Sequence, residues 1–190
     1  MLLNWLIIVI VVALVLGPIA YVMPSPREKR QGKLRERALA MGVQVKFVSY
    51  HKLNPEAAER VSAGGEVKTP KMQSIAYRVA HEIPAVQGPA EVVLVRIPDD
   101  AGVAFDTAFE GWAVDRDTLA NWPEFTARVD ITMLQQELNS LPQEVQAYAA
   151  DERFVACYWQ ENVAADSPVV DQIGASLQRL AENLRTQLMD

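Results

Sequence analysis

Residues 153–160 read RFVACYWQ, and residues 167–188 read SPVVDQIGASLQRLAENLRTQL. The first stretch is rich in β-branched and aromatic residues, which is typical of a strand. The second opens with a Ser that can cap a helix, and its apolar residues recur every three or four positions, which predicts an amphipathic helix. We expect this helix to pack on a sheet, with a short coiled-coil seam as the alternative. The apolar stripe consists of Val170, Ile173, Leu177, Leu180, Leu184 and Leu188.

Earlier segments supply further strands. Apolar and polar residues alternate, or apolar residues run together, over residues 43–50, 73–80, 91–97 and 109–114, with turn-forming residues between them. This spacing predicts an antiparallel meander. Residues 142–150 are expected to form a short helix, and residues 130–141 fit a helix or a strand. The fold class is therefore α+β, with a small mixed or antiparallel sheet and a long C-terminal amphipathic helix.

The N-terminal run, residues 5–23, reads WLIIVIVVALVLGPIAYVM and contains no charged residue. As a helix it is about 28 Å long, close to the hydrocarbon thickness of a bilayer. The run predicts one N-terminal transmembrane helix, with Trp5 and Tyr21 near the interfaces and Pro18 at a kink. A cleaved signal peptide is an alternative, although no basic residue precedes the run. A buried core helix is the other alternative.

Positive charge follows this run. Residues 27–37 contain six Lys or Arg and two Glu, whereas residues 38–190 contain 12 basic and 22 acidic residues. Basic flanks stay on the cytoplasmic side, so we expect the N-terminus outside and an acidic cytoplasmic domain. The flank binds anionic lipid or only sets the topology. Its basic residues are Arg27, Lys29, Arg30, Lys33, Arg35 and Arg37.

A helix is expected over residues 25–41. Ser25, Pro26 and Glu28 form a capping-box pattern, and Gly42 is a suitable residue to end the helix. The chain therefore divides into an anchor at residues 1–24, a basic juxtamembrane helix at residues 25–42 and an α+β domain at residues 43–190.

Composition excludes several classes. The net charge of −6 over 190 residues excludes a typical basic nucleic-acid-binding protein. The single cysteine, Cys157, excludes an intrachain disulfide and a cysteine-based zinc cluster, and we expect it to be buried. His51 and His81 have no metal-ligand spacing, and neighbouring carboxylates such as Asp115 and Asp117 identify no site alone. We therefore predict no catalytic residue, cofactor or metal.

Aromatic residues are the remaining candidates. Trp112, Trp122 and Trp159 either form a partner surface or complete a small core. An exposed apolar patch at Trp112 and Trp159 would favour a protein partner. A pocket in which carboxylates converge with Arg78 or Arg116 would favour a ligand-binding or enzymatic domain.

The segments Pro24-Ser25-Pro26-Arg27-Glu28-Lys29-Arg30, Gly111-Trp112 and Tyr158-Trp159-Gln160-Glu161 give the chain a family resemblance. It resembles uncharacterised proteobacterial single-pass inner-membrane proteins, some of which are labelled preprotein translocase subunit YajC-like. YajC proteins carry a Gly-Asp-x-Val-x-Thr-x-x-Gly segment where this chain has Gly42-Val43-Gln44-Val45. The resemblance implies a location in the bacterial inner (plasma) membrane.

The expected function is a non-enzymatic, membrane-anchored interaction or accessory module. Its expected partners are the lipid bilayer and a membrane protein, with no nucleic acid and no metal. One alternative is an accessory subunit of protein translocation. A second is a membrane-tethered domain that binds a small ligand or is an enzyme.

Overall fold

The computed structural model describes residues 5, 6, 10, 12, 14, 25–53, 55, 56, 59, 61, 64–84, 88–98 and 107–189. Its helices are α2 (Pro26–Ala40), α3 (Trp122–Arg128), α4 (Ile131–Asn139) and α5 (Val169–Met189), with a short 3-10 helix η2 (Leu119–Asn121). Its strands are β1 (Gln44–His51), β2 (Lys71–Ala80), β3 (Val92–Arg96), β4 (Thr107–Phe109), β5 (Trp112–Val114), β6 (Val145–Ala150) and β7 (Phe154–Trp159).

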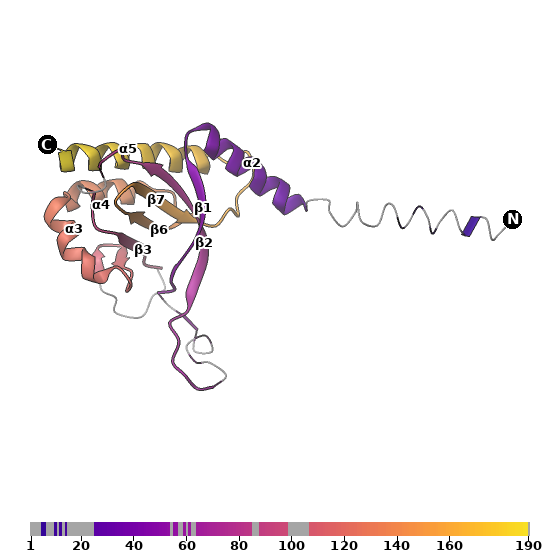
Figure 1. Ribbon diagram of the computed structural model, residues 1–190, viewed down its shortest axis with the longest axis horizontal. Helices are drawn as coiled ribbons and strands as arrows, with labels where there is room; N and C mark the ends of the chain where they lie inside the picture. The colour runs from indigo at the N-terminus through magenta and orange to yellow at the C-terminus, as the bar shows by residue number, and fades with distance from the viewer. Residues whose placement is uncertain are drawn as a thin grey trace.

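In the described residues the strands form one seven-stranded sheet in the order β1-β2-β7-β6-β3-β5-β4 (Figure 1). Every pair of neighbours is antiparallel. The β6–β7 hairpin lies between β2 and β3, so the first strands do not follow one another as the predicted meander requires.

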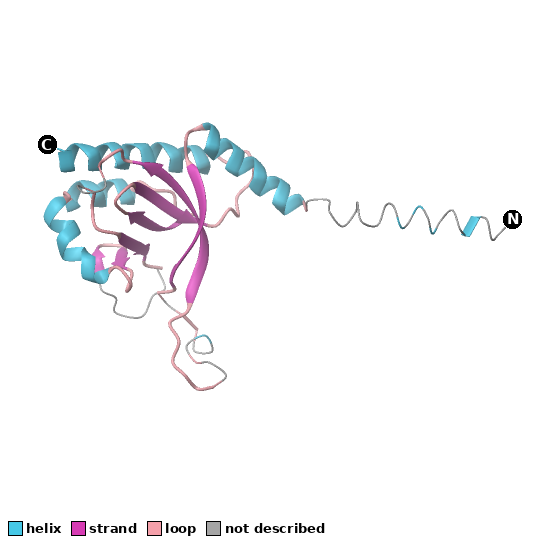
Figure 2. Cartoon of the chain, in the orientation of Figure 1, coloured by secondary structure: helices cyan, strands magenta, loops and turns pink. Residues whose placement is uncertain are grey.

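One face of the sheet carries the main core. Inward side chains such as Tyr77, Leu94, Cys157 and Trp159 pack there with residues of α2, α3, α4 and α5. The helices cover this side of the sheet in Figure 2. The predicted stripe on α5 is buried from Val170 to Leu184, which confirms that this helix packs on the sheet.

The opposite face carries a second, smaller apolar cluster. Its floor consists of small residues on neighbouring strands, and two tyrosines rise from it. Among the described residues, none in a helix belongs to this cluster, so we call this side of the sheet the open face. The cluster contains Tyr50, Ala76, Val93, Val95, Ala147, Ala149, Ala156 and Tyr158.

The ends of β1 and β2 extend beyond the rest of the sheet. β2 pairs with β7 only from Ile75 to Ala80, whereas it pairs with β1 from Lys71 to Arg78. The overhanging residues 48–51 and 71–74 form what we call the arm. The ring centroids of Tyr50 and Tyr158 lie 5.7 Å apart, and the Tyr50 hydroxyl donates a hydrogen bond to Gln146 Oε1 at 3.0 Å. These contacts place the arm across the open face.

The capping box at the start of α2 is confirmed. The Glu28 amide donates to Ser25 Oγ at 3.2 Å, and the Ser25 amide donates to Glu28 Oε2 at 2.6 Å. These bonds lower the pKa of Glu28. Gly42 follows the helix with φ of +77°, a conformation that side chains rarely adopt.

The predicted membrane anchor needs correction. A span requires about 20 consecutive apolar residues in one helix. Most of residues 5–23, Pro18 and Tyr21 included, lie outside the described residues; among those described, no helix has the length and apolarity to cross a bilayer. The 21-residue helix α5 is interrupted by charges such as Arg179 and Glu182. This finding contradicts the predicted transmembrane helix, the single-pass topology and the bacterial inner-membrane location. The corrected fold class is a seven-stranded antiparallel sheet with helices on one face.

Two strand and helix assignments also change. Residues 142–150 were expected to be helical, but Val145–Ala150 is strand β6 at the centre of the sheet. Residues 109–114 were expected to form one strand, but Gly111 has a φ of +82° and turns the chain between β4 and β5. Within residues 130–141, Ile131–Asn139 forms helix α4, and the Asp130 side chain caps it by accepting from the Thr132 amide.

Candidate functional site

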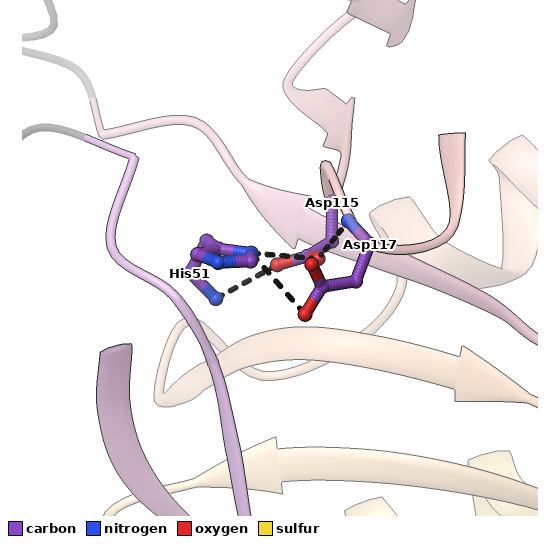
Figure 3. A group of neighbouring side chains, drawn as sticks. All are labelled: His51, Asp115 and Asp117. Atoms are coloured by element: carbon purple, nitrogen blue, oxygen red, sulfur yellow. Dashed lines mark hydrogen bonds and ion pairs between the residues drawn. The ribbon is translucent and has the colours of Figure 1, made fainter. Parts of the chain in front are cut away.

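A cluster of polar residues joins the arm to the far side of the sheet (Figure 3). His51 ends β1, and Asp115 follows β5, five places away in strand order. The His51 amide donates to Asp115 Oδ2 at 2.7 Å, and His51 Nδ1 lies 3.1 Å from Asp115 Oδ1. Lys71, the register partner of His51, donates to Asp117 Oδ2 at 2.7 Å. We call these four residues the latch.

The latch is partly buried, and hydrogen bonds to β3 hold it in place. Asp115 is 3% exposed and His51 is 8% exposed, whereas the side chain of Asp117 is largely exposed. The Asp115 amide donates to Val93 O, and the Val93 amide donates to Thr118 Oγ1, so β3 holds the turn that carries both aspartates. The hydrogen bond from Lys71 lowers the pKa of Asp117 and raises the pKa of Lys71.

One nitrogen of His51 and one oxygen each of Asp115 and Asp117 lie within 4.8 Å of one another. An imidazole and two carboxylates are a donor set that Zn²⁺ and other divalent cations use. In this arrangement the two carboxylates already have partners. Asp115 accepts hydrogen bonds from two backbone N–H groups, and Asp117 accepts one from the Lys71 ammonium group. The geometry therefore corresponds to a closed structural latch, and a metal would have to displace Lys71 from Asp117.

A hollow of about 550 Å³ lies on the open face beside the arm. Its floor is made of Ala76, Ala149 and Ala156, and Tyr158 also lines it. Burial raises the pKa of the Tyr158 phenol above its ordinary value. Small floor residues leave room over the sheet that larger side chains would fill. Its charged lining residues are Lys46, Arg78, Glu91 and Asp151.

Arg78 is positioned by two neighbours. Its guanidinium carbon lies 4.1 Å from the ring centroid of Phe154, and its Nε donates to Gln44 Oε1 at 3.2 Å. Stacking on an aromatic ring limits the orientations of a guanidinium group. The hollow therefore brings a fixed cation together with two carboxylates, those of Glu91 and Asp151.

A second hollow, of about 430 Å³, includes Tyr50, Leu53 and Met72 of the arm side and Val95, Arg96 and Ile97 of the β3 side. Arg96 has a structural role, because its Nε donates a hydrogen bond to Val145 O at 2.9 Å and its guanidinium carbon lies 4.8 Å from the ring centroid of Trp112. The arm therefore separates two hollows on the same face.

The tryptophans named as a partner surface occupy different places. Trp112 is 1% exposed and Trp159 is 0% exposed, and both belong to the main core. Trp122 is half-buried at the start of α3, where it stacks on Phe125 with ring centroids 5.8 Å apart. The structure does not bring these three indoles together on one exposed patch.

The basic residues of the flank fall into two groups, one that pairs with acidic residues of the domain and one on the first turns of α2. Arg35 donates through Nε and Nη2 to the buried carboxylate of Glu161, which also accepts a hydrogen bond from the Tyr77 hydroxyl. Arg37 pairs with Asp171 of α5. Arg27, Lys29, Arg30 and Lys33 lie on the first turns of α2, before its buried residues Leu34 and Ala38. Trp5 is among the described residues and is exposed.

Sequence reasoning missed the latch and the hollow. His51 and Asp115 lie 64 residues apart, and no local spacing links them. Arg78 and the two carboxylates come from three different segments of the sheet. The available signal was the run of alanines on one face of β6 and β7, which is unusual for sheet residues that fill a core.

No family model matches the chain, and no curated protein matches it. Among solved structures, it is similar to the crystal structure of the mycobacterial trehalose monomycolate transport factor A, TtfA, with a TM-score of 0.45 and 10% identity. That match covers 82% of this chain and 94% of the other. A similarity at this level establishes neither a shared fold nor a shared function.

Proposed function

We propose that this chain is a binding module that takes a small ligand in the hollow on the open face of its sheet. The observation that carries the proposal is the convergence of Arg78, Glu91 and Asp151 on a cavity of about 550 Å³. Ligand sites commonly have volumes of about 300–1,000 Å³ and a few converging polar groups.

Three features support this function over a protein-docking surface. Helices cover one face of the sheet and leave the alanine-floored face open. The arm crosses that face and is held by the latch, so the hollow has a wall as well as a floor. Trp112 and Trp159, which would have formed an apolar partner patch, lie in the core. The interaction-module and translocation-accessory functions remain predictions.

The proposal can be tested with the full-length chain and labelled backbone amides. Free amino acids and dipeptides, nucleotides, sugars and fatty acids would each be titrated while amide chemical shifts are recorded. We expect one class to cause saturable shifts at Ser49, Ser74, Ala149 and Ala156. Ala156→Trp fills the floor and should abolish those shifts, whereas Ala175→Trp, on the exposed side of α5, should not. Shifts confined to other parts of the chain, or none at millimolar concentrations, would contradict the proposal.

A further inference from the structure

The two sides of the hollow carry opposite charges. Arg78 and Lys46 lie on β2 and β1, and Lys46 is the register partner of Ala76, one step along the same face from Arg78. In the described part of the chain, neither Lys46 nor Arg78 takes part in an ion pair. The hydrogen bond to Gln44 uses only the Nε of Arg78, and a guanidinium group has four further N–H donors on its two terminal nitrogens.

The acidic side lies across the alanine floor. Glu91 directly precedes β3, and Asp151 directly follows β6. Asp151 Oδ1 accepts the amides of Arg153 and Phe154, which fixes the carboxylate and leaves Oδ2 outside these bonds. Glu91 is exposed at the rim of the hollow.

The register gives the separation of the two sides. Arg78 pairs with Ala156, Ala156 with Ala149, and Ala149 with Val93, so three strand spacings separate β2 from β3. At about 4.8 Å each, these spacings put the two backbones about 14 Å apart. The Arg78 guanidinium lies over the ring of Phe154 on β7, and Asp151 follows β6, so these two charged groups lie closer together than the backbones of β2 and β3. A molecule of one or two amino-acid residues matches the remaining gap.

We propose that the hollow takes a small zwitterion of amino-acid or dipeptide size. Its carboxylate would lie at Arg78 and Lys46, and its ammonium group at Glu91 and Asp151. Arg is suited to bind a carboxylate through two parallel hydrogen bonds. A simple anion such as phosphate would meet the same cations but would also face two carboxylates. A fatty acid would place its uncharged alkyl chain beside the carboxylates of Glu91 and Asp151.

This inference rests on the proposed function and specifies its ligand, so its test must separate the two. Calorimetric titration of the full-length chain would use alanyl-alanine, its N-acetylated form and its C-terminal amide. We expect alanyl-alanine to bind, and loss of either charge to weaken binding at least about tenfold, as for other hydrogen bonds to charged groups. Arg78→Gln should weaken binding of alanyl-alanine but not of the amide. Glu91→Gln should weaken binding of alanyl-alanine but not of the N-acetylated form.

Arg116→Gln is the matched control, because Arg116 is exposed and does not line the hollow. Equal affinities for the three compounds, or an equal effect of Arg78→Gln and Arg116→Gln, would overturn the inference. If another compound class binds and Ala156→Trp blocks it while alanyl-alanine does not bind, the proposed function stands and the zwitterion does not. If no class binds at the hollow, both are overturned.

Discussion

Cys157 illustrates how a single position in the sheet controls reactivity. It lies on the helix-covered face of β7, is 0% exposed and belongs to the main core. Burial disfavours the charged thiolate and raises the pKa of the thiol to about 12, although the charge of Arg96 acts in the opposite direction. The expectation of a buried cysteine from the sequence is confirmed, and the residue is not placed to act as a nucleophile.

We predict that iodoacetamide modifies Cys157 at least about a hundredfold more slowly in the folded protein than in urea at pH 8. The thiolate is the reactive form, and a pKa of about 12 instead of 9.0 leaves it almost absent. Mass spectrometry over time would give both rates. Because folding raises this pKa, its contribution to stability is complete below pH 9 and is lost as the pH rises toward 12. Rapid modification of the folded chain would contradict this placement in the core.

Residue-level patterns predicted burial well but did not predict the site. Alternation along residues 153–160 is enough to place Cys157 and Trp159 on one face of a strand. The partners of His51 depend instead on how the arm crosses the sheet, which involves contacts between residues far apart in the chain. Isolated histidines and aspartates carry no local signal of such contacts, so the latch could not be predicted.

At the scale of elements, the sequence predicted a helix correctly where it carries a capping box or a long run of apolar residues at helical spacing. The capping box of α2 and the stripe of α5 predicted both helices to within a few residues. Strand β6 was mistaken for a helix because Gln, Glu and Ala favour helices in isolation. Its pairing with β3 and β7, with Tyr148 and Ala150 buried on one face, overrides that preference.

Helix α2 is joined to the sheet through a buried charge. The side chain of Glu161 is 0% exposed and accepts from Arg35 and Tyr77. Arg35→Met would leave this carboxylate without its cation, which typically costs about 3–5 kcal/mol. We therefore predict a fall in the free energy of unfolding of roughly 3 kcal/mol, measured by urea denaturation. Lys33→Met, two residues earlier and exposed, should change it by less than about 0.5 kcal/mol. Equal effects would mean that α2 does not depend on this pair.

At the scale of the whole molecule, the open face results from the order of the strands and from the arm. Strand β1 lies at one edge of the sheet and β5 lies next to the other edge. His51 and Asp115 can therefore form a hydrogen bond only if the sheet is strongly curved. The helices fill the other face, so the curvature leaves hollows on both sides of the arm. Strand order depends on which distant segments pair, and periodicity within each segment does not specify it. The curvature, and with it the hollow, therefore could not be predicted from the sequence.

The latch should control the arm without holding the rest of the sheet together. Asp115→Ala removes the acceptor of the His51 and Asp117 amides and the partner of the His51 ring. We predict that amide hydrogen exchange in residues 49–51 and 71–73 becomes at least about tenfold faster, because local opening then costs less. Exchange in β6 and β7, which pair with each other and with further strands on either side, should stay unchanged. Mass spectrometry of exchanged peptides would measure both regions.

Asp166→Ala is a suitable control, because Asp166 is exposed and lies between β7 and α5, away from the latch. It should leave exchange in the arm unchanged. Treatment of the unmodified protein with EDTA should also have no effect, because Lys71 and backbone N–H groups already satisfy the two carboxylates. Faster exchange in EDTA would show that a cation, rather than Lys71, holds the arm closed. Faster exchange of β6 and β7 in Asp115→Ala would instead show that the latch supports the whole sheet, because opening of the arm would then be coupled to unfolding of its centre.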